Sequence, residues 1–382
     1  MLDGNKKMII NASIDRIKFN NQIEFDKFIQ ENLLSDCDQE EADGQFFITC
    51  IIINIEFSKT IRLYLSQNQF NNLYKESRGD KIIASITSEA CEADNILKVT
   101  DNRTIDTITI DKIKKKILKD LDQASIPEEI QIHSSLSKFF DFEWEDFYDS
   151  VKVKRFYLSA KYNPNFFKFD LDHVLFLISR ASPKNSKITK EIEEELLNFQ
   201  IRLTKTNRIY PIKSVTFKYL HDKYIMDEEN LFILNVVGHG DKDGSYYCEN
   251  CDTEGDYTKF SPLNKEGFVS LFNQVKIKIL NLSFCYSGRN IEILQQSLPC
   301  NLIDKGIAEY VIATKYSVGS KYMAAFNKYF YDNLFDKVDN QSNSRIEDSF
   351  FDAKNRIESE YKDKDELCCK NNLILVQSFQ SS

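Results

Sequence analysis

The stretch KIKILNLSFCYSG, residues 276–288, starts as a mostly apolar run and ends in a cysteine with a glycine three places later. Such a run is typical of a strand that is covered on both faces, as in a parallel sheet between layers of helices. We expect the strand to end at Ser283, which places Cys285 just beyond its carboxyl end. In open parallel sheets this is the edge at which ligands bind. Cys285 is therefore a candidate nucleophile, with a buried core thiol as the alternative.

The segments around this strand alternate between strand-like and helix-like patterns. Apolar residues at helical spacing predict helices over 187–200, from about Ser320 onward, and over 346–361. This alternation predicts an α/β domain over residues 166–382, built on a mainly parallel sheet flanked by helices. Its other strands are predicted at 173–179, 214–220, 231–237, 309–314 and 372–376.

The first part of the chain shows a different pattern, in which β-branched and aromatic runs are separated by short polar breaks. We predict a β-rich α+β domain over residues 1–165. An aromatic, acidic segment at 139–151 carries the only tryptophan and is expected to pack between the domains. The role of this first domain is left open between regulation, sensing, substrate adaptation and structural support. Its strands are predicted at 45–57, 60–66, 81–87 and 104–110, followed by a lysine-rich helix at 111–121.

Composition narrows the classes of partner and the compartment. The chain has 382 residues and a formal net charge of −9, which argues against a general nucleic-acid or membrane-surface binder and favours proteins as partners. Nine cysteines spread thinly over such a length do not resemble a disulfide framework. No signal peptide and no apolar run near the ~20 residues of a membrane span are visible. We therefore expect a soluble, cytoplasmic protein with reduced thiols.

A second strand end carries the natural partner of Cys285. The predicted strand 231–237 runs into Gly-His-Gly, with His239 between two glycines. If the two strands are neighbours, both side chains reach the same edge of the sheet. A thiol needs a nearby base or cation to become a nucleophilic thiolate, and the amides of Gly240 and Cys285 could stabilise an oxyanion. These parts predict acyl transfer at a shared Cys–His site.

The loop after His239 also contains Cys248 and Cys251 as a C-x-x-C pair. Such a pair could begin a zinc site or form a redox couple. No second pair of this kind accompanies it, so a four-ligand site would need recruits from elsewhere in the chain. We therefore favour ordinary thiols and predict no metal. The candidate recruits are His221, Cys300, Cys368 and Cys369.

The segments FILNVVGHG and KIKILNLSFCYSG together resemble the two signatures of the caspase-like cysteine peptidases of clan CD, especially the CHAT domain proteins. HVLFLISRASPKNSKITKEIEEELLNF looks like the opening strand, turn and acidic helix of that domain, and LIDKGIAEYVIATKYSVGSKYMAAFNKYFYDNL like its closing strand and helix. The resemblance covers about residues 168–376. It implies a caspase-like fold, Cys285 as nucleophile, His239 as general acid for the leaving amine, and Gly240 as an oxyanion-hole amide.

The resemblance also implies peptide-bond hydrolysis without a cofactor, and control by an activating protein or ligand. Several relatives that cut after Lys or Arg carry an Asp where this chain has Ser283, which argues against a basic P1 preference unless acidic residues elsewhere form such a pocket. Ser283, Asp241, Asp243 and Tyr286 are candidates for the S1 pocket or a lid, with a plain solvated loop as the alternative. A role in antiviral defence or programmed cell death would fit the family.

Two other functions remain as alternatives to the endopeptidase. One is a catalytically silent caspase-like scaffold that binds a partner, which would need neither Cys285 nor His239. The other is a cysteine-dependent acyl hydrolase or transferase that acts on something other than a peptide.

Overall fold

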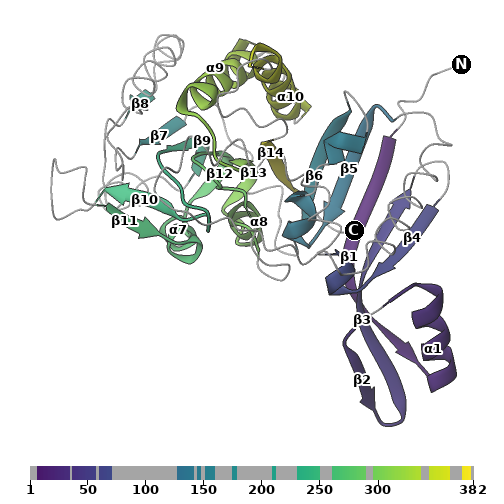
Figure 1. Cartoon of the computed structure of the whole chain (residues 1–382). Helices are drawn as coiled ribbons and strands as arrows, with labels where there is room; N and C mark the ends of the chain where they lie inside the picture. Colours follow the sequence, from purple (N-terminus) through teal and green to yellow (C-terminus); the bar gives the residue numbers. More distant parts are fainter. Residues whose placement is uncertain are drawn as a thin grey trace, which may run out of the picture. The chain divides into compact units, whose positions relative to one another are not determined.

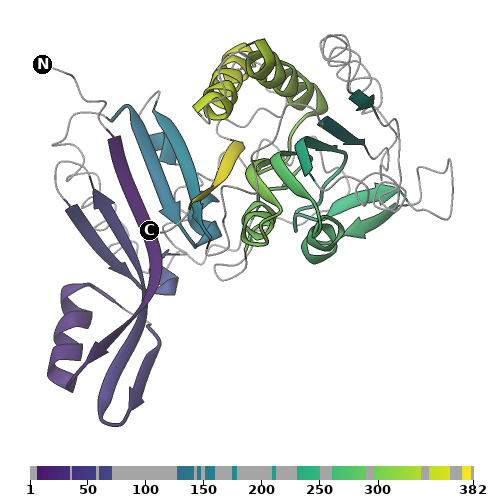
Figure 2. The ribbon, with the colours of Figure 1, turned by 180° about the vertical axis from the view of Figure 1, so that it is seen from behind.

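The computed structural model describes a little over half of the chain and divides it into two compact units. Unit 1 comprises Met1–Phe156 with Glu292–Leu294, and unit 2 comprises Tyr157–Ile291 with Gln295–Ser382. The predicted boundary was residue 165. Figures 1 and 2 show the whole chain from opposite sides. The described residues are 7–34, 37–56, 60–70, 127–141, 144–147, 151–159, 174–178, 209–211, 230–249, 260–289, 296–336, 344–361 and 372–379.

Unit 1 is rich in β-strands, as predicted. The long strands β1 (Lys7–Phe19) and β3 (Gln45–Glu56) run antiparallel, and β5 (Glu129–Ser134) lies parallel to β1 on its other side. β2 (Gln39–Ala42) and β4 (Thr60–Leu65) both pair with β3, and β6 (Lys152–Leu158) follows β5. The predicted strands 45–57 and 60–66 are confirmed. Those at 81–87 and 104–110, and the helix at 111–121, lie outside the described residues.

Two local features complete unit 1. Helix α1 (Gln22–Glu31) begins where the Asn21 side chain accepts a hydrogen bond from the Glu24 amide, and Phe25 packs edge-on against Phe19. The aromatic segment near 139–151 forms the 3₁₀ turns η1 (Ser137–Asp141) and η2 (Trp144–Phe147). Trp144 is buried there and donates from Nε1 to the Phe139 carbonyl.

Unit 2 contains the mainly parallel sheet that the sequence predicts. Its strand order is β14-β13-β12-β9-β7-β8. All neighbours in this order pair in parallel except β13 and β14, which run antiparallel. The strands are β7 (Val174–Ile178), β8 (Ile209–Pro211), β9 (Asn230–Val237), β12 (Lys276–Ser283), β13 (Ala308–Thr314) and β14 (Leu373–Phe379). The predicted strand 214–220 lies outside the described residues.

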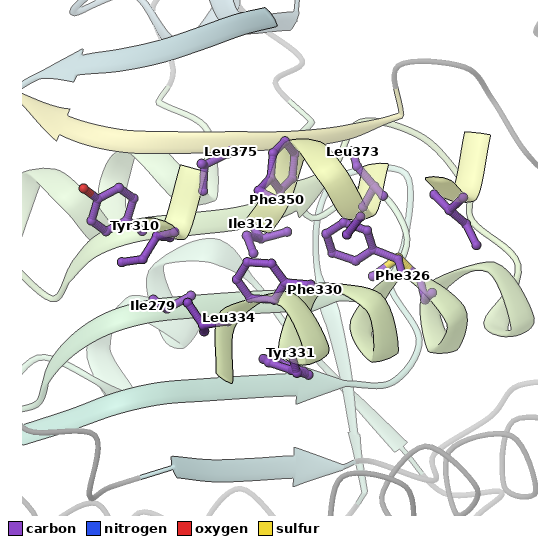
Figure 3. Close-up of a cluster of buried hydrophobic side chains, with 14 of the residues drawn as sticks. Ile279, Tyr310, Ile312, Phe326, Phe330, Tyr331, Leu334, Phe350, Leu373 and Leu375 are labelled. Carbon is purple, nitrogen blue, oxygen red and sulfur yellow. The ribbon is translucent and has the colours of Figure 1, made fainter. Parts of the chain in front are cut away.

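Helices cover both faces of the strands at the centre of unit 2. All seven residues of β13 are buried, and successive side chains of a strand point to opposite faces, so both faces need cover. Tyr310 and Ile312 pack with helices α9 (Ser320–Asp336) and α10 (Ser344–Glu360), as Figure 3 shows. On the other side lie α7 (Lys265–Leu271) and α8 (Leu298–Asp304) (Figures 1 and 2). The apolar spacing of 320–334 and 346–361 therefore describes faces that pack on the sheet.

A small second hairpin lies beside the sheet. Strands β10 (Tyr246–Glu249) and β11 (Phe260–Leu263) pair antiparallel. Tyr246 is fully buried and packs against Phe268 and Phe284 at centroid distances of 6.1 and 4.9 Å. No strands were predicted in this part of the sequence. The hairpin fixes the loop that follows β9.

Candidate active site

The register of β9 and β12 aligns the two strand ends that carry the candidate dyad. The strands pair in parallel with Val237 opposite Ser283. His239 and Cys285 each follow two residues after these paired positions. Because neighbouring strands lie about 4.8 Å apart, both residues leave the sheet side by side at its carboxyl edge. The condition set by the sequence analysis, that the two strands be neighbours, is met.

The loop of His239 touches the loop of Cys285 through Gly240. A Cβ placed on Gly240 would lie 2.1 Å from the Cys285 carbonyl oxygen and 2.6 Å from Cδ2 of Phe284. Only glycine permits this approach, since the oxygen belongs to the backbone and cannot turn aside. Among the described residues, neither the Gly240 amide nor the Cys285 amide donates to another group. Both donors are therefore free to serve an oxyanion.

The β10 hairpin fixes the backbone on both sides of His239. The Tyr247 amide donates to the His239 carbonyl at 2.9 Å, and the Asp241 amide donates to the Ser245 carbonyl at 2.9 Å. In addition, the Tyr246 hydroxyl donates to the carbonyl of Val237, the last residue of β9, at 2.8 Å. Hydrogen bonds with the β10 hairpin therefore fix the backbone turn that carries His239.

The imidazole of His239 is half-buried and held neutral. Burial lowers the pKa of His239 below its usual value of 6.5, because the charged form loses hydration. Its Nε2 atom is buried and has no hydrogen-bond partner within the described part of the chain. A neutral ring with an unoccupied nitrogen is suited to accept a proton and later return it.

The thiol of Cys285 contacts the segment that follows β13. The Val318 amide donates to Sγ at 3.4 Å, and Sγ in turn lies 3.6 Å from the Val318 carbonyl oxygen and 3.6 Å from Oγ of Ser317. The sequence analysis did not single out this segment. Its signal was available, since residues 315–318 follow a third parallel strand and so reach the same edge of the sheet.

The turn after Cys285 is held by β13 as well. Tyr286 adopts a left-handed backbone conformation with a φ of 59°, and its amide donates to the Tyr316 carbonyl at 3.1 Å. A bulky residue rarely occupies this region, which is a form of strain found at functional sites. Two residues on, the Gly288 amide donates to the Thr314 carbonyl at 2.8 Å, and the Thr314 amide donates to Oγ of Ser287 at 2.9 Å. The surroundings thus fix the conformation of Tyr286.

Ser283 lies beneath the site, in a buried network of polar side chains. Its hydroxyl is 3.0 Å from Oδ1 of Asn235 on β9 and accepts from Nδ2 of Asn327 on α9 at 3.0 Å. Asn281 adds a donation to Oδ1 of Asn327 at 2.8 Å. With 5% of its surface exposed, Ser283 ties two strands to a helix. These contacts give no support to its predicted place in an S1 pocket.

The other S1 or lid candidates lie on exposed or half-buried positions around the dyad. Asp241 and Asp243 are exposed; their carboxylates accept from the Tyr247 hydroxyl at 2.7 Å and from the Ser245 amide at 2.8 Å. Tyr286 is half-buried, and the guanidinium of Arg289 lies 5.4 Å from its ring centroid. Asp241 and Asp243 follow His239 in the chain and Tyr286 follows Cys285, and their role toward a substrate stays a prediction.

The thiol pair Cys248 and Cys251 lies only partly within the described residues. Cys248 belongs to β10, opposite Ser261, whereas Cys251 lies outside the described residues. Within the ranges given above, no group of three or more His, Cys, Asp or Glu side chains is placed to hold a metal ion. In the same ranges, no helix is long and apolar enough to cross a membrane.

Comparisons with known proteins add a likeness of fold. No family model matches the sequence, and no curated protein matches it. The structure is similar to that of the Arg-specific cysteine proteinase gingipain R, with 11% identity over 70% of this chain and 67% of that chain and a TM-score of 0.44. It is similar to the complex of the Porphyromonas gingivalis RgpB pro- and mature domains, with 13% identity, coverage of 70% and 68%, and a TM-score of 0.45.

A third similar structure is the Saccharomyces cerevisiae separase–securin complex, with 10% identity and a TM-score of 0.40. There the match covers 73% of this chain and 18% of that chain. At such identities the likeness concerns the fold alone. We therefore base the functional inference on the contacts of the chain's own residues.

Proposed function

We propose that the protein is a caspase-like cysteine endopeptidase that hydrolyses peptide bonds of a protein substrate at Cys285 and His239. The observation that carries the proposal is the close approach of Gly240 to Cys285. A Cβ added to Gly240 would lie 2.1 Å from the Cys285 carbonyl oxygen. This contact joins the loop of the histidine to the loop of the cysteine. We infer that the amides of Gly240 and Cys285, which donate to no other group among the described residues, form an oxyanion hole there.

In the proposed reaction His239 accepts the thiol proton of Cys285 as the sulfur attacks the substrate carbonyl carbon. The S–C bond forms, and the carbonyl oxygen takes the negative charge opposite the amides of Gly240 and Cys285. The imidazolium then gives its proton to the leaving amine as the C–N bond breaks. Water, deprotonated by the same imidazole, hydrolyses the thioester and restores the free thiol.

The side-chain contacts also favour a latent resting state. The Cys285 thiol is engaged with Ser317 and Val318, whereas Nε2 of His239 has no partner among the described residues. Catalytic hydrogen bonds often form only when substrate is bound, so such an arrangement is compatible with an enzyme awaiting substrate or activator. We propose that an activating protein or ligand completes the site.

The test is peptide-library cleavage followed by mass spectrometry, with the wild-type chain, Cys285→Ala and the control Cys37→Ala. Cys37 is a half-buried thiol of unit 1 that forms no disulfide, so its loss should leave cleavage unchanged. Cleavage that disappears only in Cys285→Ala supports the endopeptidase and reports its P1 preference. Equal cleavage by all three proteins rejects it.

The alternative is a silent scaffold, favoured by the engagement of the thiol with backbone groups instead of with His239. A peptidyl electrophile separates the two functions. Selective labelling of Cys285 over Cys37 and Cys300 supports an enzyme, and equal labelling rates for the three thiols support the scaffold.

A further inference from the structure

Asn372, the residue before β14, makes an unusual number of contacts with one short segment. Its carbonyl accepts from the Lys315 amide at 2.9 Å, and its Oδ1 accepts from the Tyr316 amide at 2.8 Å. Its Nδ2 donates to the Ser317 carbonyl at 2.9 Å. Three consecutive residues after β13 are thus bound by a single, fully buried side chain and its backbone. A segment held this way has little freedom to move independently of β14.

The segment 315–318 in turn meets Cys285 from two directions. Its Ser317 hydroxyl and Val318 amide lie 3.6 and 3.4 Å from Sγ, and its Tyr316 carbonyl accepts the amide of Tyr286. The position of the Cys285 side chain and that of the backbone after it therefore both depend on contacts with residues 315–318. Asn372 itself contacts neither.

The chemistry of these contacts bears on the ionisation of the thiol. Hydrogen-bond donors favour a thiolate, whereas an acceptor favours the neutral thiol. Val318 supplies one of each, a donating amide and an accepting carbonyl, and the Ser317 hydroxyl can turn its proton toward the sulfur. In the described residues the three contacts of Sγ are all with uncharged groups. Of the three contacts, the hydroxyl of Ser317 is the one that can serve either as donor or as acceptor.

We propose that Asn372 is a positioning residue that holds segment 315–318 against Cys285, and that the Ser317 hydroxyl is the donor that stabilises the Cys285 thiolate. The consequence for turnover rests on the endopeptidase function proposed above. The ionisation of the thiol does not, because it is measured without any substrate.

The experiment follows alkylation of Cys285 by iodoacetamide as a function of pH in the full chain, read by mass spectrometry of the Cys285 peptide. Ser317→Ala should slow alkylation at pH 7 by about 3- to 10-fold and raise its pH midpoint by about 0.5 to 1, the effect of one lost hydrogen bond to a charged group. Ser317→Thr keeps a hydroxyl and should retain the wild-type profile. The peptides of Cys37 and Cys300 serve as internal references that should not change.

Asn372→Ala should move the profile in the same direction as Ser317→Ala. Because Asn372 acts through Ser317, the double variant should show no more than the effect of Ser317→Ala alone. The matched control is Ser378→Ala, which removes a buried hydroxyl at the other end of β14 that has no hydrogen-bond partner among the described residues. It should leave the alkylation profile in place.

A Ser317→Ala profile that superimposes on the wild type overturns the assignment of Ser317. Additive effects in the double variant, or an equal change in Ser378→Ala, overturn the role of Asn372. If Asn372→Ala does not fold, the pair Ser317→Ala and Ser317→Thr still decides whether this segment tunes the thiol. A shifted midpoint in Ser317→Ala, together with equal peptide cleavage by the wild type and Cys285→Ala, would reject the endopeptidase and leave the positioning role supported.

Discussion

Two turns of the molecule use glycine for different reasons. In unit 1 the turn between β2 and β3 consists of Asp43 and Gly44, both at positive φ (53° and 69°), and a Cβ on Gly44 would meet nothing within 4 Å. This glycine satisfies a local backbone requirement of a tight hairpin. In unit 2 Gly240 has no positive φ, and its Cβ position is blocked by the Cys285 carbonyl. Gly240 is required because two segments that are distant in sequence approach each other closely at this point. Such an approach indicates where the fold brings side chains from different segments together.

The largest expected effect comes from His239, which the second turn presents. His239→Ala should lower peptide cleavage by about 10²- to 10⁴-fold, the contribution typical of a positioned general acid–base. The matched control is His133→Ala in unit 1, another half-buried histidine, whose pKa burial lowers to about 4. Steady-state cleavage of a peptide from the library should distinguish the two, and equal losses would contradict a special role for His239.

The pH profile of cleavage by the wild-type chain should show the same dependence on His239. Since burial lowers the pKa of His239, its ring stays neutral to a lower pH than that of a free histidine, which is half protonated at about pH 6.5. The acid limb of the cleavage rate should therefore fall below pH 6.5. An acid limb above pH 6.5 would indicate that another group carries the proton.

Gly240→Ala tests the close contact itself. A methyl group cannot occupy a position 2.1 Å from a backbone oxygen, so the two loops must separate and misplace the oxyanion-hole amides. We expect cleavage to fall by about 10²- to 10³-fold, the value of one lost oxyanion donor. Unit 1 should be unaffected, which hydrogen exchange of β1 and β3 can verify; full activity of Gly240→Ala would remove the basis of the proposed site.

Ser283→Ala tests the network beneath the dyad. It leaves the amides of Asn235 and Asn327 without their shared partner in a buried place, which should reduce the free energy of unfolding by about 1–3 kcal/mol. Cleavage should fall less than in the His239 and Gly240 variants, with P1 preference unchanged. A changed P1 preference in peptide-library cleavage would restore Ser283 to the S1 pocket.

Gly44→Ala should have the smallest effect. Its left-handed conformation makes alanine cost about 1 kcal/mol of stability, measured by urea unfolding, and cleavage should remain at the wild-type level. A large loss of activity would show that the two turns are not as separate in function as their local contacts indicate.

Much of unit 2 could be predicted from the sequence because its strands are continuous apolar runs. The runs at 231–237 and 276–283 became β9 and β12, and the glycines beside His239 marked a turn. The last strand was also predicted, although its antiparallel direction was not, since hydrophobic pattern carries no information on strand direction. The pairing of Val237 with Ser283 depends on how the two strands align in the sheet, and neither segment specifies this alignment by itself.

The contacts that refine the site could not be predicted in this way. Asn372 and Ser317 are separated by 55 positions and meet only because β14 pairs with β13. Ser283 was considered for substrate recognition because of its place two residues before Cys285. A short polar residue at the end of a strand can face either the substrate or the interior. The contact with Asn327 on α9 shows that Ser283 faces the interior.

The position of Asn372 in the chain has a consequence for synthesis. Cys285 and His239 leave the ribosome before β14 does, and at about 5–20 residues per second the interval lasts several seconds. During this time the segment 315–318 lacks the hydrogen bonds that Asn372 provides. A nascent chain therefore carries Cys285 and His239 before residues 315–318 gain these hydrogen bonds, and the contacts of the Cys285 thiol with this segment become fixed only once β14 has emerged.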